Sequence, residues 1–338
     1  MVLSAASEAA LTAAFGVMIF TDLIGNTLVI LTVIKTRAMR TPMNYLLVNL
    51  AVADITVALF IAPRYIFSHA YTHPGGQVGT YLCKLLTGEV FTWVGALTSV
   101  YTLVAISFER YYAVMQPQSI KGRFTLRKFQ ITAASCWTFA TLWNIPLFTF
   151  FSFDEKNQLC NFVWPFPDFP KYHSTINAFV YGAIPIGTMV CLYSRVTYRL
   201  WFKQNDHTSA ATQQGTIKAR KRVTKMVLTV SIIFSVMWMP NLVTYPVSAY
   251  NEVALYDAVH VMSIVFVTLN SSINPIVYSL QSNMFRRNIW RVVTCGKNNR
   301  VENETTGNNS TDKTNASVHV PQMRSKAVND MALADVDL

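Results

Sequence analysis

Residues 45–70 read YLLVNLAVADITVALFIAPRYIFSHA, and this stretch decides the fold. It is long enough to cross the hydrocarbon core of a bilayer, which takes about 20 residues at helical rise. Its one acidic residue, Asp54, lies mid-way along it. A carboxylate is costly in hydrocarbon, so the stretch predicts a transmembrane helix that carries a functional polar residue.

Six more apolar runs accompany this one, at residues 11–34, 81–112, 129–153, 175–202, 226–250 and 253–280. Apolar residues make up 52% of the chain and charged residues 13%, which leaves too little polar surface for two or three soluble domains. The sequence therefore predicts an all-α membrane protein, a bundle of seven transmembrane helices.

The basic residues gather in alternate connections between these runs. Segments 35–40, 121–128, 199–225 and 286–297 carry eighteen Lys and Arg, whereas the other connections carry only Lys156 and Lys171. The positive-inside rule then predicts an extracellular N-terminus and a cytoplasmic C-terminus in a multi-pass protein of the plasma membrane. A basic excess spread over four connections also argues against a nucleic-acid partner.

These patterns divide the chain into four parts. We expect an extracellular N-terminus at 1–10 and a seven-transmembrane helix domain at 11–282. An amphipathic membrane-surface helix follows at 283–295, where Cys295 is a candidate for palmitoylation. Residues 296–338 are rich in Asn, Thr and Ser and predict a disordered cytoplasmic tail.

Cys83 and Cys160 are the two cysteines expected to face an oxidising compartment, since the other three fall within spans or on the inner side. A disulfide between them would attach the loop after the fourth span to the top of the third. Two free buried thiols are the alternative.

Polar residues inside the spans mark candidate sites. Oxygen-bearing side chains near mid-depth accompany Asp54, and such a set suits a monovalent cation: Ser99, Asn270, Ser271 and Asn274. The alternative is a structural polar cluster in which waters and Asn26 satisfy Asp54. Glu109 and Arg110 form an adjacent pair at the inner end of the third span, where the glutamate can hold the arginine.

The ordered motifs resemble those of rhodopsin-like (class A) G-protein-coupled receptors, most closely the neuropeptide receptors. The resemblance runs from Gly25 to about Cys295, and its pieces are Gly25-Asn26, LAVAD at 50–54, Glu109-Arg110-Tyr111, Trp137 with Pro146, Pro185 with Tyr193, Phe234 with Trp238 and Pro240, NPIVY at 274–278, and Phe285-Arg286.

This resemblance implies signalling by a population shift, in which an agonist favours a conformation with the sixth span swung outward at Pro240. Trp238 and Phe234 would be the packing switch. Arg110, Tyr193 and Tyr278, beside Asn274 and Pro275, would form the cleft for a heterotrimeric G protein. The polar set around Asp54 matches the family's sodium site, and no other cofactor is implied.

Three departures from the family pattern stand out. Cys83 lies 27 residues before Arg110, two more than usual, so either the third span is bulged or its disulfide lies higher. The usual acidic partner of the arginine on the sixth span is replaced by Arg220. Met237 replaces the common cysteine before Trp238.

The ligand is narrowed by elimination. The position that holds an aspartate in amine receptors is Thr92 or, counted from Cys83, Val90, and the retinal lysine is replaced by Thr268, so no Schiff base forms. Glu89 is either an anion for a cationic ligand or a glutamate facing water. We therefore expect a neuropeptide, with an amine or other small molecule as the alternative. The candidate pocket residues are Thr92, Trp93, Ala96, Trp238, Asn241, Tyr245, Ile264 and Thr268.

Other function classes fit less well. A transporter or channel would need paired broken helices, and a membrane enzyme would need a motif such as HExxH, neither of which the sequence contains. We expect no enzymatic activity. Besides ligand, G protein and membrane lipid, arrestin is a candidate partner for a phosphorylated tail, although a flexible polar tail needs no such role.

Overall fold

The computed structural model describes residues 5–67, 70–117, 124–156, 159–202, 211–251 and 258–294. These residues belong to one compact unit, residues 1–297. The tail at 298–338, together with Cys295, lies outside the described residues.

Six helical segments of the described residues are long and apolar enough to cross a membrane. They are α1 (Ala5–Lys35), α2 (Pro42–Tyr65), the α3–α4 segment (Gly76–Met115), the α7–η4 segment (Phe169–Phe202), α9 (Ala211–Tyr250) and α10 (Ala258–Gln281). The remaining predicted span is α5 (Leu126–Trp143) continued by α6 (Ile145–Phe150), and α5 is less apolar because Arg127 and Lys128 lie in its first turn. The bundle of seven predicted spans is thus present.

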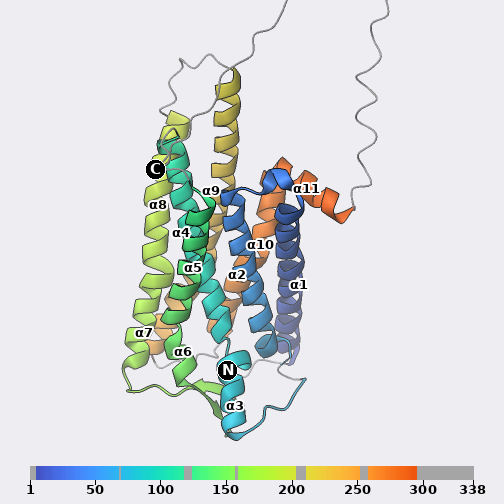
Figure 1. Cartoon of the computed structure of the whole chain (residues 1–338). Helices are drawn as coiled ribbons and strands as arrows, with labels where there is room; N and C mark the ends of the chain where they lie inside the picture. Colours follow the sequence, from blue (N-terminus) through green and yellow to red (C-terminus); the bar gives the residue numbers. More distant parts are fainter. Residues whose placement is uncertain are drawn as a thin grey trace, which may run out of the picture. The chain divides into compact units, whose positions relative to one another are not determined.

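Local capping signals explain where two of the helices begin. Thr41 accepts a hydrogen bond from the Asn44 N–H, and Pro42 occupies the first turn of α2, where its missing N–H costs nothing. Ser282 caps α11 (Asn283–Val293) in the same way. Figure 1 shows α11 lying across the ends of α1 and α10, at the end of the bundle opposite α3.

Close backbone approaches at two glycines bring the central helices together. A Cβ atom added to Gly25 on α1 would lie 2.9 Å from the Pro275 ring on α10. One added to Gly95 on the third span would lie 2.8 Å from the Ala53 carbonyl oxygen on α2. Small residues at such crossings permit the close packing that membrane helices depend on.

The third span is interrupted near the disulfide. It runs as α3 (Gly76–Leu82), a π-helix η2 (Cys83–Thr87) and α4 (Val90–Met115). Glu89, between η2 and α4, has φ +62°, and among the described residues it is the one non-glycine residue with a left-handed backbone. A π-turn and a break absorb extra residues, so the two-residue offset of Cys83 comes from a bulge, the first of the two alternatives.

A disulfide joins Cys83 to Cys160, as predicted, with an S–S distance of 2.04 Å. Cys160 lies on β2 (Leu159–Phe162), which pairs antiparallel with β1 (Phe151–Asp154). This hairpin was not predicted. Phe151 and Phe153 prolong the apolar run of the fourth span, but they are buried as strand residues around the disulfide.

Several predicted boundaries were wrong, among them the start of the sixth span, which was expected at Met226, whereas α9 begins at Ala211. The second span was expected to reach Ala70, but α2 ends at Tyr65, and the fourth was expected to reach Phe153, where β1 replaces the helix. The N-terminal segment 1–10 was expected to lie outside the helix, yet α1 begins at Ala5, because its small and polar residues remain good helix formers. Hydropathy marks where the chain is apolar rather than where a helix stops.

We call the end of the bundle with the Cys83–Cys160 bond the disulfide end, and the end with Arg110 the arginine end.

Candidate functional site

A cavity opens at the disulfide end of the bundle and contains about 830 Å³ of empty space, part of it open to solvent. Four of the predicted pocket residues lie on its wall: Trp93, Trp238, Asn241 and Tyr245. Its other lining residues come from the second to seventh spans and from the hairpin, among them Tyr65, Phe162, His173, Tyr181 and His260. Such a concave, mostly apolar site with a few polar groups is typical of a ligand-binding pocket.

The deep part of this cavity is aromatic. Tyr181 stacks on Trp238 with ring centroids 5.5 Å apart, and Trp238 contacts Phe234 at the same separation. The Tyr181 hydroxyl donates to Asn144 Oδ1 at 3.1 Å. Tyr181 was not among the predicted residues, because nothing in the sequence shows that the π-helix η3 (Ala178–Ala183) turns it toward the sixth span.

A charged pair lies on the cavity wall. Arg64, in the last turn of α2, has its Nε 2.9 Å from Glu89 Oε1. Glu89 is only 6% exposed, so the interpretation of a glutamate facing water is wrong. The helix interruption at Glu89 turns this residue inward beside Arg64, a residue that the sequence analysis did not select.

The other four predicted pocket residues do not line this cavity. Thr92 and Ala96 are buried between helices, and Ile264 belongs to an apolar cluster with residues of α1 and α2. Thr268 donates its hydroxyl to the Ile264 carbonyl oxygen of its own helix at 2.9 Å. Counting along the sequence placed these residues on the third and seventh spans but did not give the helix face that they occupy, which only packing decides.

A polar cluster lies deeper in the bundle around Asp54, which is fully buried. Ser99 Oγ donates to Asp54 Oδ1 at 2.9 Å, and Asn274 Nδ2 donates to Asp54 Oδ2 at 2.7 Å. Ser271 also hydrogen bonds this carboxylate. The side-chain oxygens of Asn270 and Asn274 are buried without a hydrogen-bond partner among the described residues. Unpaired oxygens around a buried carboxylate are a donor set that fits a hard cation.

A second buried carboxylate accompanies this cluster. Asp22 on α1 is fully buried, its Oδ1 accepts a hydrogen bond from Asn26 Nδ2 at 2.8 Å, and its Oδ2 has no hydrogen-bond partner among the described residues. Asp22 and Asp54 interact electrostatically. Asn26 also reaches the Ser271 backbone carbonyl at 3.4 Å. The sequence analysis missed Asp22, although a charge inside the first apolar run was a usable signal.

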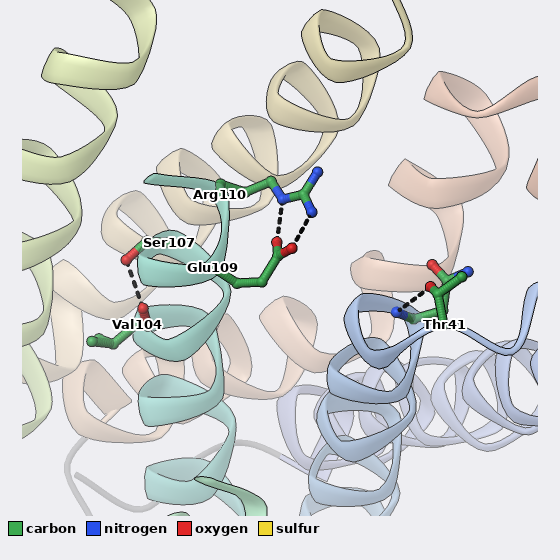
Figure 2. A network of polar contacts seen from close by, with 6 residues as sticks. Thr41, Val104, Ser107, Glu109 and Arg110 are labelled. Carbon is green, nitrogen blue, oxygen red and sulfur yellow. Dashed lines mark hydrogen bonds and ion pairs between the residues drawn. The ribbon is translucent and has the colours of Figure 1, made fainter. Parts of the chain in front are cut away.

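Glu109 and Arg110 are paired at the arginine end. Both guanidinium contacts, through Nε and Nη2, go to the two Glu109 carboxylate oxygens, and Figure 2 shows this bidentate pair. Both residues are buried. No other acidic partner of Arg110 is found among the described residues. Glu109 is therefore the acidic group that holds Arg110. This agrees with the sequence, in which Arg220 replaces the usual acidic partner on the sixth span.

The other predicted switch residues lie on the helices around this pair. Tyr193 and Tyr278 are buried, on α8 (Ile184–Thr197) and α10, and Tyr278 packs against Phe285 of α11 at 5.8 Å. Pro240 and Pro275 lie inside α9 and α10, two helices that are in contact. The structure thus distributes the predicted residues over three levels: a cavity, a buried polar cluster and a paired arginine.

Comparison with known proteins agrees with this arrangement. Residues 25–278 match the family described as 7 transmembrane receptor (rhodopsin family). The chain belongs to this family. Rhodopsin-family members are receptors rather than enzymes, as the sequence analysis expected.

Several relatives of this rhodopsin-family receptor are themselves receptors named after peptides. It is 29% identical over 300 residues to "Tachykinin-like peptides receptor 86C" of Drosophila melanogaster, covering 83% of this chain and 58% of that protein. It is 30% identical to "Allatostatin-A receptor" of Bombyx mori, covering 83% and 78%, and 30% identical to "RYamide receptor" of Drosophila melanogaster, covering 78% and 59%. The chain therefore spans under two thirds of the length of two of these relatives.

Proposed function

We propose that this chain is a plasma-membrane receptor that binds a neuropeptide at its disulfide end and activates a heterotrimeric G protein at its arginine end. The observation that carries this proposal is the position of Trp238. It lies on the wall of the cavity, and it belongs to α9, a single helix that runs from Ala211 to Tyr250. A ligand that repacks Trp238 therefore acts directly on this long helix.

The membrane orientation follows from charge. The connections at the arginine end carry the basic residues, so this end faces the cytoplasm and the disulfide end faces the oxidising outside. An epitope tag before residue 1 would then be labelled in intact cells, whereas a tag after residue 338 would need permeabilised cells.

Signal transmission is a shift between two packings of the sixth span. Pro240 lies two residues after Trp238, and a proline inside a helix removes a backbone hydrogen bond and permits a hinge. An agonist that favours the outward position of α9 opens the region beside Arg110, Tyr193 and Tyr278. The agonist can shift the equilibrium between the two packings only by the difference in its affinity for them.

A sodium ion stabilises the inactive packing in this scheme. Asp54, Ser99, Asn270, Ser271 and Asn274 would hold it, and the buried unpaired oxygens of Asn270 and Asn274 support the assignment. The ion supplies a positive charge that offsets a carboxylate in the interior.

A peptide ligand is supported by the relatives and by the cavity. The relatives are named for tachykinin-like peptides, allatostatin-A and RYamide. The cavity combines aromatic walls with amide side chains at Asn144, Asn177 and Asn241, which suits a peptide backbone and aromatic side chains. Arrestin binding to the tail and palmitate on Cys295 remain proposals for residues outside those described.

The experiment is a ligand screen in cells that express the receptor with a promiscuous G protein. We expect a response to members of a peptide panel, and loss of that response in Trp238→Ala at equal surface expression. The matched control is Met239→Ala, since Met239 is the neighbouring residue and is exposed on the outside of the bundle. A response to amines alone would replace the peptide with a small molecule, and substrate flux without signalling would indicate a transporter.

A further inference from the structure

Arg64 and Glu89 form a pair of opposite charges on the cavity wall, at the interruption of the third span. Glu89 lies at the N-terminus of α4 with the left-handed backbone described above, a conformation that is unfavourable for a non-glycine residue. Its side chain is buried, and its Oε1 accepts no hydrogen bond of good geometry among the described residues although Arg64 Nε lies 2.9 Å away. Glu89 thus presents an incompletely satisfied acceptor at the cavity.

Arg64 completes a site that donates as well as accepts. Its side chain is 21% exposed and lies at the cavity, with its guanidinium 6.0 Å from the centre of the Tyr65 ring. Tyr65 in turn hydrogen bonds the Glu89 carboxylate. A guanidinium offers five N–H donors and no acceptor, whereas a carboxylate only accepts. The two groups side by side thus form a donor next to an acceptor.

Among the residues that the structure describes, the rest of the cavity wall carries no fixed charge. Apart from two histidines, His173 and His260, the other lining residues are neutral, and most are aromatic or carry amide groups. The fixed charges of Arg64 and Glu89 therefore sum to zero. A ligand carboxylate would gain the arginine but meet the buried glutamate, and a ligand ammonium would meet the arginine in the same way.

We propose that Arg64 and Glu89 form a subsite for a primary carboxamide, so that this receptor selects peptides whose last residue is aromatic and whose C-terminus is amidated. The amide carbonyl accepts from the Arg64 guanidinium while the amide NH₂ donates to the Glu89 carboxylate, and neither charge loses its partner. The aromatic residue packs among Trp93, Tyr181 and Tyr245. This inference rests on the proposed peptide receptor function and names its ligand class.

The probe is a set of synthetic heptapeptides that end in Phe or Tyr, each made with a C-terminal amide and with a free carboxylate. Signalling is measured in cells with a promiscuous G protein. For the wild-type receptor we expect the amides to be more potent than the matched acids by about ten-fold or more, the effect of one unfavourable charge contact.

Glu89→Gln should change this preference, because it leaves Arg64 without its anion and removes the repulsion of a carboxylate. The ratio of acid to amide potency should rise by about ten-fold. Arg64→Gln should weaken both forms and weaken the acids more. The control is Asp168→Asn, which removes the same charge from an exposed residue that does not line the cavity and should leave the ratio unchanged.

A single replacement leaves its partner's charge in the wall, so folding is monitored by surface expression and the double variant Arg64→Gln/Glu89→Gln is measured as well. The double variant removes both charges, and its potencies for amides and acids should converge.

Three results would overturn the proposal in distinguishable ways. Equal potencies of amides and acids on the wild type, or a ratio that Glu89→Gln and Asp168→Asn leave equally unchanged, removes the carboxamide subsite and leaves the peptide receptor in place. Failure of every peptide while amines activate the receptor removes both.

Discussion

Asp22 and Asp54 place two carboxylates in the bundle interior, and neither takes part in an ion pair among the described residues. Buried charges of this kind need a cation, a proton or several donors. Asp54 has three hydrogen-bond donors around it, whereas Asp22 has one, from Asn26. Asp22 interacts electrostatically with Asp54, so the charge state of Asp22 would also affect the proposed sodium site.

Asp54→Asn is therefore expected to abolish the stabilisation of the purified receptor by sodium. Thermal unfolding would be compared in NaCl and in choline chloride at equal ionic strength. Asp22→Asn should keep the sodium effect but require about five-fold more sodium, as the loss of about 1 kcal/mol of attraction predicts. Asp168→Asn, at the surface, is the control, and a sodium effect that survives Asp54→Asn would remove the ion from this cluster.

The Glu109–Arg110 pair supports a second prediction at this scale. Because Glu109 is the acidic partner of Arg110 found among the described residues, Glu109→Gln should free the arginine and raise signalling without agonist. Glu109→Asp, which keeps the carboxylate, should raise it less. Arg110→Ala should lose G-protein activation at normal surface expression, measured with a G-protein biosensor. Unchanged signalling by Arg110→Ala would exclude the proposed cleft.

At the scale of elements, crossings between helices depend on small residues such as glycine. A hydropathy pattern does not identify these positions. Gly25 faces the Pro275 ring, and Pro275 lies in the NPIVY motif of α10. Contact between α1 and α10 therefore constrains the helix that carries Asn274 and Tyr278. A change in this contact reaches the polar cluster and the arginine end together.

Gly25→Ala tests this crossing. Its new Cβ would lie 2.9 Å from the Pro275 ring, and we expect a loss of about 1–3 kcal/mol of stability as the helices move apart. Gly16→Ala is the matched control on the same helix, because nothing lies within 4 Å of its added Cβ. The control should be neutral or stabilise by up to about 1 kcal/mol. Equal unfolding temperatures for both variants would contradict the close approach.

For the whole molecule, the disulfide joins parts of the chain 77 residues apart. It attaches the hairpin to the interrupted start of the third span, next to the Arg64–Glu89 pair. The bond therefore restricts the conformational freedom of the unfolded chain, and in the folded protein it restrains the shape of the cavity entrance.

Removing this bond by Cys83→Ser/Cys160→Ser should cost about 2–5 kcal/mol, since the longer unfolded chain regains its freedom. The unfolding temperature should fall, and ligand response should weaken more than surface expression. The control is Cys191→Ser, which changes an exposed free cysteine. A double variant as stable as this control would show that packing alone holds the hairpin.

The sequence by itself determined the features that depend on composition and order along the chain. Apolar runs identify the spans, since each helix satisfies its own backbone in lipid, and the basic connections predict the orientation. Ordered motifs indicated the family, and the cysteine pair was predicted from the sides of the membrane on which the cysteines fall. Asp22, a charged residue inside the first apolar run, could have been selected in the same way, but it was overlooked.

Only the tertiary structure decided which side chains share a site. The break at Glu89 turned a residue expected at the edge into a buried partner of Arg64, and Tyr181 reached Trp238 through a π-turn. Thr92 and Thr268 were assigned to the pocket by counting, yet they pack between helices. The physical reason is that a local change in helical geometry rotates every residue beyond it, and the energy of that change comes from long-range packing around the disulfide and the hairpin.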